Sequence, residues 1–151
     1  MHSFIKLISI FLFAVFISCK KDQFTETPSL KFEKVNTQEL HPGQVLTFTL
    51  SFTHKGKFNG NLLVQELVPK CSNVEIDTIN SPYPLPDFPA VNNTKGEITV
   101  SYGYNVVGFS PVNTPKCPNR NDTAIYRFVL KSDSMHVSDT VSSPPIVIFY
   151  Q

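Results

Sequence analysis

The chain has 151 residues and a formal net charge of +1, and its 13 phenylalanines and 12 prolines contrast with three alanines and no tryptophan. The near balance of basic and acidic side chains argues against nucleic acid or an anionic surface as a partner, since both attract an excess of positive charge. The aromatic and proline content argues against a helical protein, so we expect a single β-domain.

The first 18 residues predict a secretory signal peptide. Lys6 precedes an apolar run over residues 7–17 that only Ser9 interrupts. This run is shorter than the roughly 20 residues that a permanent membrane-spanning helix needs. We therefore expect the segment to direct export and then to be removed. The mature chain then carries 12 basic and 12 acidic residues, because Lys6 is the only charged residue in the removed part.

The end of this segment resembles the lipobox of bacterial lipoproteins, because the small residue Ser18 precedes Cys19. The resemblance implies that Cys19 becomes the lipidated first residue, and that residues 19–28 form a flexible tether between the membrane and a domain at 29–151. Lys20-Lys21-Asp22 is similar to the charged stretch after the lipid cysteine in outer-membrane lipoproteins of the Bacteroidetes, where such residues favour export to the cell surface. The alternative is an ordinary signal peptide in which Cys19 has no special role.

Alternation of apolar and polar residues predicts short strands along the mature chain. The clearest case is the segment 46–53, where every second residue is apolar and the others are Ser or Thr, as in a half-buried antiparallel strand. The segment 61–68 has apolar spacing that also suits a helix, but Gly60 and Pro69 bound it at strand length. The expected strands are 29–35, 46–53, 61–68, 73–80, 98–104, 122–130 and a last strand over 135–150 that Pro144-Pro145 interrupts.

Two proline-containing stretches, 81–89 and 109–120, are predicted to be loops. The first holds four prolines in nine residues, so it cannot donate a continuous hydrogen-bond ladder. Because binding residues concentrate on loops, Tyr83, Phe88 and Phe109 are candidate aromatic anchors for a partner. The plainer interpretation is that these rings cover the ends of the core.

Residues 122–130 carry the strongest fold signal. Asp122, Ala124 and Tyr126 are followed by Phe128 and Leu130 at alternate positions. The D-x-A-x-Y pattern resembles the start of strand F in immunoglobulin-type sandwiches, where the tyrosine hydroxyl bonds to the main chain as a tyrosine corner. The resemblance implies an all-β fold, a single antiparallel immunoglobulin-like β-sandwich of about seven strands. With the signal region, it makes the chain similar to small immunoglobulin-like outer-membrane lipoproteins of the Bacteroidetes with no assigned activity.

Cys71 and Cys117 are the two cysteines that remain once Cys19 carries lipid. In an exported chain, an even pair is most simply a disulfide. Closing a loop of ~46 residues would contribute roughly 4 kcal/mol in the chain-entropy model. A redox-active or metal-binding role is the alternative, but the sequence has neither a C-x-x-C spacing nor a histidine beside either cysteine.

No pattern in the sequence indicates catalysis, a metal or another cofactor. Histidine, aspartate and glutamate are scattered, and motifs such as H-E-x-x-H and G-x-S-x-G are absent. We therefore expect a non-catalytic interaction module, anchored by lipid in the cell envelope, that binds a protein partner or a glycan through its loops. The alternative is an envelope enzyme, or an enzyme inhibitor, whose active loop carries no recognised motif.

Four short segments place an acid, a hydroxyl residue and an apolar residue in a row. This pattern resembles the acceptor motif for protein O-glycosylation in exported Bacteroidetes proteins. The resemblance implies modification at one or more of Thr78, Thr123, Ser134 and Thr140. The same tripeptide is also common where a strand begins, because the acid then lies in the preceding turn.

Overall fold

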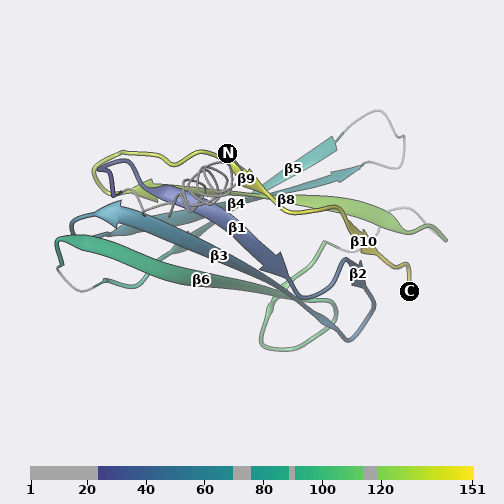
Figure 1. Ribbon diagram of the computed structural model, residues 1–151. Helices are drawn as coiled ribbons and strands as arrows, with labels where there is room; N and C mark the ends of the chain where they lie inside the picture. The colour runs from purple at the N-terminus through teal and green to yellow at the C-terminus, as the bar shows by residue number, and fades with distance from the viewer. Residues whose placement is uncertain (1–23, 70–75, 89–90, 114–118) are drawn as a thin grey trace, which may run out of the picture.

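The structure is a computed structural model that describes residues 24–69, 76–88, 91–113 and 119–151, with the backbone alone for residues 69 and 76–79. Two β-sheets face each other (Figure 1). These ranges contain no helix, and so none that is long and apolar enough to cross a membrane. The strands in the described ranges are β1 Ser29–Val35, β2 Glu39–Leu40, β3 Val45–Lys55, β4 Gly60–Pro69, β5 Ile76–Pro84, β6 Asn93–Gly103, β7 Ser110–Pro111, β8 Asp122–Ser132, β9 Val141–Ser142 and β10 Ile146–Ile148.

The two sheets have different strand orders. The first runs β1-β3-β6-β7, and the second runs β2-β10-β8-β4-β5, with β9 paired to β8 beside this path. The long strands pair antiparallel, whereas the two short pairs β10–β2 and β6–β7 are parallel. The predicted all-β sandwich is therefore confirmed, with ten described strands where about seven were expected. An immunoglobulin-like topology stays a prediction.

β3 shows why alternating residues form strands here. It pairs with β1 on one side and with β6 on the other, so it lies in the interior of its sheet. Its apolar residues point toward the second sheet and are at most 1% exposed, and they are Leu46, Phe48, Leu50 and Phe52. Burying each such side chain stabilises the fold by about 1.5–3 kcal/mol, which fixes the register of the strand.

The segment with ambiguous spacing forms a strand, as predicted, because β4 pairs with β8 on one side and β5 on the other. The proline-rich stretch differs from its prediction at the start, since β5 continues through Pro82 to Pro84 and the loop begins only afterwards. β5 is the edge strand of its sheet, so a residue without an N–H is tolerated on the side that has no neighbouring strand. At the C-terminus, Pro144-Pro145 separates β9 from β10.

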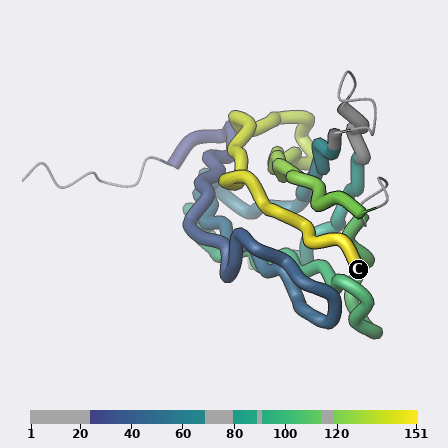
Figure 2. The backbone as a smooth tube through the Cα atoms, turned by 90° about the vertical axis from the view of Figure 1, so that its right-hand side faces the viewer, coloured from purple at the N-terminus to yellow at the C-terminus, as the bar shows by residue number. Residues whose placement is uncertain are grey.

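The two ends of the sandwich carry different features. The chain enters β1 at Ser29, which lies opposite Thr53 near the end of β3. The β6–β7 loop, residues 104–109, follows Gly103, whose partner Val45 begins β3 at the other end. Figure 2 shows the first described residues and this loop on opposite sides of the molecule. The described part of the chain therefore begins at the end remote from the β6–β7 loop.

Candidate functional site

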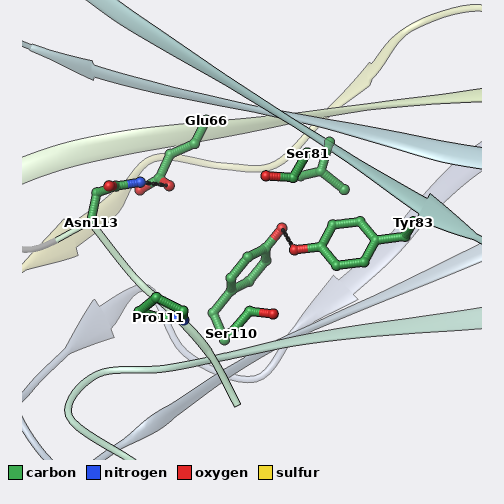
Figure 3. Close-up of a pocket in the computed structure, with 8 residues that line it drawn as sticks. Glu66, Ser81, Tyr83, Ser110, Pro111 and Asn113 are labelled. Carbon is green, nitrogen blue, oxygen red and sulfur yellow. Dashed lines mark hydrogen bonds between the residues drawn. The ribbon is translucent and has the colours of Figure 1, made fainter.

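A cavity of about 300 Å³ opens where β5 and β7, the edge strands of the two sheets, approach each other (Figure 3). We name it the edge pocket. Its walls come from β4, β5, β6, β7 and the segment just after β7. The lining residues are Val64, Glu66, Ser81, Tyr83, Tyr102, Ser110, Pro111 and Asn113. The volume lies at the small end of the range for ligand-binding pockets.

Glu66 places a carboxylate inside the core. Its side chain is 5% exposed, and it occupies an inward position of β4 between the buried residues Val64 and Val68. The alternation of the strand would normally put an apolar residue here. Taking a charge out of water is unfavourable by several kcal/mol unless hydrogen bonds compensate for the lost hydration.

Among the described residues, Tyr126 and Asn113 donate hydrogen bonds that compensate for that lost hydration. The Tyr126 hydroxyl, directly opposite Glu66 on β8, donates to Oε1 at 3.0 Å. Nδ2 of Asn113, which follows β7, donates to Oε2 at 2.5 Å. Hydrogen bonds to a charged group are stronger than those between neutral groups. They hold the carboxylate at the inner wall of the edge pocket and join the segment after β7 to the second sheet.

The tyrosine-corner prediction is wrong in its hydrogen bond. Tyr126 is fully buried on the inner face of β8, as the alternation predicts, but its hydroxyl donates to Glu66 and not to the main chain. A bond from a tyrosine to the main chain is made by Tyr104, whose hydroxyl donates to the carbonyl oxygen of Phe149 at 2.9 Å. The pattern identified the strand and its buried face, whereas the partner of the hydroxyl is set by a residue on another strand.

Three tyrosines lie at the edge pocket or beside it, and we name them the tyrosine cluster: Tyr83, Tyr102 and Tyr126. The hydroxyl of Tyr83 donates to that of Tyr102 at 3.2 Å, which links β5 to β6 across the sheets. The ring centroids of Tyr102 and Tyr126 are 5.5 Å apart. Burial raises the pKa of Tyr102 and of Tyr126, and hydrogen bonds and the charge of Glu66 raise both further. Both hydroxyls therefore keep their protons at neutral pH.

The edge pocket combines hydrogen-bonding groups with negative charge. Four lining side chains carry hydroxyls, Glu66 adds the carboxylate and Asn113 the amide, and none of the described lining residues is Lys, Arg or His. Figure 3 shows Ser81 and Ser110 on opposite sides of the tyrosine hydroxyl pair. Hydroxyl groups both donate and accept, so this arrangement can orient a polar ligand by hydrogen bonds.

The β6–β7 loop forms a second candidate surface around a hollow of about 500 Å³. Val107 at its tip is 98% exposed, and Phe109 is 44% exposed. The base of the loop is held in place, because the Tyr104 N–H donates to the carbonyl of Gln44 and Asn105 Nδ2 donates to Gln151 Oε1, both at 2.9 Å. The hollow is lined by Gly103, Asn105, Val106, Val107, Phe109, Pro111 and Val112.

The three aromatic anchors predicted from the sequence lie in three different settings. Phe109 is exposed on the β6–β7 loop, and Tyr83 is half-buried in the wall of the edge pocket. Phe88 packs between the core rings of Phe52 and Phe58, with centroid distances of 5.1 and 6.3 Å. For Phe88, the structure therefore shows the packing role that was the plainer interpretation.

The predicted modification sites are only partly described. Thr123, Ser134 and Thr140 are exposed, whereas the side chain of Thr78 on β5 lies outside the described atoms. Cys19, and both cysteines of the predicted Cys71–Cys117 disulfide, lie outside the described residues. Lipidation, the disulfide and O-glycosylation therefore stay predictions.

None of the described histidines lines the edge pocket. His41 and His136 are exposed, and His54 is buried with its ring 5.2 Å from that of Phe58. Within the described residues, no three His, Cys, Asp or Glu side chains gather in a way that could hold a metal ion.

Sequence reasoning missed Glu66, Asn113 and Tyr102 as parts of a site. A signal was present for Glu66, because it is the one charged residue among the inward positions of β4, between Val64 and Val68. No comparable signal exists for Asn113, whose partner is 47 positions away in the chain.

Comparisons with known proteins give no family. No protein-family model matches the chain, and no curated protein shows a significant match. Among solved structures it is similar to the sporulation control protein Spo0M of Bacillus subtilis, at 8% identity and a TM-score of 0.46, with 83% of this chain and 50% of that one covered. It is also similar to the alkylpurine DNA glycosylase AlkC of Pseudomonas fluorescens, at 7% identity and a TM-score of 0.44, with 84% and 31% covered.

A third similar structure is a Niemann-Pick type C2 protein from the Japanese carpenter ant, at 13% identity and a TM-score of 0.42, with 85% of this chain and 98% of that one covered. The chain spans half the length of Spo0M and about a third of AlkC. At these identities and TM-scores, the likenesses carry no inference about what this chain does.

Proposed function

We propose that this protein is a lipid-anchored, non-catalytic binding module of the cell envelope, which recognises a protein partner through the β6–β7 loop. The observation that carries this proposal is the exposed apolar tip of the loop, where Val107 is 98% exposed and Phe109 is 44% exposed beside a hollow. Apolar side chains that gather on a domain surface mark interaction sites, whereas single ones are common everywhere.

The chemistry of the loop favours a protein over a glycan as its partner. Residues 105–112 contain no charged side chain, and most of them are apolar. Aliphatic side chains such as Val107 offer no hydrogen bonds to sugar hydroxyls, but they pack well against an apolar patch on another protein. Aromatic residues such as Phe109 frequently supply much of the binding energy at protein interfaces.

Hydrogen bonds within the domain hold the base of the loop. The Tyr104 N–H and the Asn105 side chain fasten its base to Gln44 and Gln151. Gly108 has a φ of 91°, a conformation that other residues rarely adopt. Less conformational entropy is lost on binding when the loop is pre-organised, so a small apolar surface can still give useful affinity.

The signal region supports the envelope location, and the fold supports the orientation of the module. A tether on Cys19 would reach the domain at the end that carries Ser29, whereas the β6–β7 loop lies at the opposite end. β3 alone spans 11 residues, or about 36 Å at ~3.3 Å per residue, between these ends. The loop would therefore face away from the membrane that holds the lipid.

The proposal is tested by affinity capture from detergent-solubilised envelopes with the full-length chain. We expect one stoichiometric partner protein to be captured by the wild type and lost with Val107→Asp, because a charge at the centre of an apolar contact is strongly unfavourable. Val91→Asp is the matched control, since Val91 is also exposed, at 48%, but lies outside this loop. Cys19→Ala should move the protein from the membrane fraction to the soluble fraction.

Three results would contradict the proposal. These are the capture of no stoichiometric protein, equal capture by the wild type and Val107→Asp, and unchanged membrane retention of Cys19→Ala. The first two would exclude the loop as the contact surface, and the third would exclude the lipid anchor.

A further inference from the structure

We propose that the edge pocket is a second binding site, separate from the β6–β7 loop, and that it takes a neutral, polyhydroxylated ligand of the size of one sugar ring. The site is the space between Glu66, the tyrosine hydroxyl pair and the serines Ser81 and Ser110. It uses side chains other than Val107 and Phe109, so its test is independent of the proposed protein partner.

The lining groups match the hydroxyls of a sugar. A sugar hydroxyl donates one hydrogen bond and accepts others, and the hydroxyls of Ser81, Tyr83, Tyr102 and Ser110 do the same. The high pKa of Tyr102, caused first by burial, keeps its proton available for donation. The rings of Tyr83 and Pro111 add apolar surface to the same walls, where the C–H groups of a sugar ring can pack.

The charge of the site opposes anionic ligands. Glu66 lies at the inner wall, and the described lining residues include no basic side chain that could neutralise an incoming negative group. Phosphates, carboxylates and acidic sugars would meet repulsion from Glu66 in a partly desolvated space, where charges interact more strongly than in water.

The environment of Glu66 also disfavours a cationic ligand as the preferred occupant. Its side chain is only 5% exposed, and each carboxylate oxygen already accepts a hydrogen bond, one from Tyr126 and one from Asn113. A cation would lose its hydration on entry, and it would find both carboxylate oxygens already bonded to Tyr126 and Asn113. The accessible polar groups are mainly neutral hydroxyls, which suit a neutral ligand.

Stability alone gives no reason for the composition of this pocket. A buried charge fixed by hydrogen bonds commonly contributes no more to folding than an apolar side chain of similar volume. β4 already carries Leu62, Val64 and Val68 on the same face, so an apolar residue at position 66 would continue a strand that packs well. The carboxylate, the amide and the hydroxyl pair together are explained by recognition of a polar molecule.

The test is an NMR titration of the full-length chain in detergent with glucose, galactose, mannose and N-acetylglucosamine. We expect saturable binding of at least one of these sugars, with shift changes at the lining residues. Asn113→Ala should weaken that binding by about tenfold, because it removes a hydrogen bond that positions the charged wall. Tyr83→Phe, which keeps the ring and removes only the hydroxyl, should weaken it by about threefold to tenfold.

Asn80→Ala is the matched control, because Asn80 is an exposed amide on β5 that does not line the pocket. The affinity of Asn80→Ala for the sugar should equal that of the wild type. Glucuronic acid, which carries a negative charge, should not bind. Failure of all four sugars to bind, equal binding by Asn113→Ala and the wild type, or tighter binding of glucuronic acid or tetramethylammonium would overturn the proposal. Each of these results leaves the test of the β6–β7 loop unaffected.

Discussion

Two clusters of three aromatic rings lie between the same two sheets, and their surroundings differ. The phenylalanine cluster is Phe52, Phe58 and Phe88, with ring centroids 5.1 to 6.3 Å apart. The tyrosine cluster is hydrogen-bonded to a carboxylate through Tyr126 and borders a cavity of about 300 Å³. Each cluster includes one half-buried ring from β5 or the residues after it, Phe88 in the first and Tyr83 in the second.

This difference distinguishes aromatic residues that stabilise the fold from aromatic residues that the fold does not require. The phenylalanine cluster consists of hydrocarbon rings in close contact, which is how protein cores gain most of their stability. The tyrosine cluster keeps a cavity, a buried charge and hydroxyl groups, all of which lower stability unless they are compensated. We therefore assign stability to the first cluster and ligand binding to the second, and the following experiments test that division.

The largest effect is expected from truncation in the phenylalanine cluster. Phe58 is fully buried, so Phe58→Ala removes a ring and leaves a cavity. The free energy of unfolding should fall by about 3–5 kcal/mol, as measured by urea denaturation. Phe109→Ala, at a position 44% exposed, should change it by less than about 1 kcal/mol. A loss below about 1 kcal/mol for Phe58→Ala would show that the cluster does not carry the stability assigned to it.

A smaller, pH-dependent effect is expected from the tyrosine cluster. Burial raises the pKa of Tyr102 and Tyr126 above the usual value near 10, so the folded chain keeps protons that the unfolded chain loses. The stability they contribute is fully present below pH ~10 and is lost as the pH rises further. Above pH ~10, each tyrosine should lower the free energy of unfolding by about 1.4 kcal/mol per pH unit, and the two together by roughly 2.7 kcal/mol per pH unit.

Urea denaturation at several pH values above ~10 measures this slope, and Tyr102→Phe provides the comparison. In Tyr102→Phe, the fall in the free energy of unfolding above pH ~10 should be smaller than in the wild type by about 1.4 kcal/mol per pH unit, which is the contribution of one tyrosine. An identical slope for the wild type and Tyr102→Phe would show that this hydroxyl is not the buried, proton-retaining group that the structure describes. The phenylalanine cluster has no titrating group and should leave the slope unchanged.

The sequence predicted the elements whose contacts are local and periodic. Alternation identified β3 and the buried face of β8, because a strand with one face in the core must repeat every two residues. It did not predict that β5 extends through Pro82, since this depends on the strand lying at the edge of its sheet. Edge position is a property of the whole fold and leaves no mark in the local pattern.

The candidate site was harder to predict than the fold for the same reason. Alternation along β4 places Glu66 in the core, but its partners Asn113 and Tyr126 are 47 and 60 positions away. The tyrosine-corner resemblance assigned the Tyr126 hydroxyl to the main chain, because nothing near Tyr126 in the sequence indicates a buried carboxylate opposite it. Pairing between β4 and β8 determines that contact.

The most direct test of the central claim removes the buried charge together with its fully buried donor, Tyr126. In Glu66→Leu/Tyr126→Phe, neither a carboxylate nor the Tyr126 hydroxyl is left buried without its partner, and the half-buried Asn113 amide, which loses its acceptor, can bind water instead. We predict a free energy of unfolding within about 1 kcal/mol of the wild type, or higher, and loss of sugar binding in the edge pocket. Two results would contradict the claim that the tyrosine cluster serves binding and not folding. One is a decrease of about 3 kcal/mol or more in the free energy of unfolding, as large as that expected for Phe58→Ala, and the other is sugar binding equal to that of the wild type.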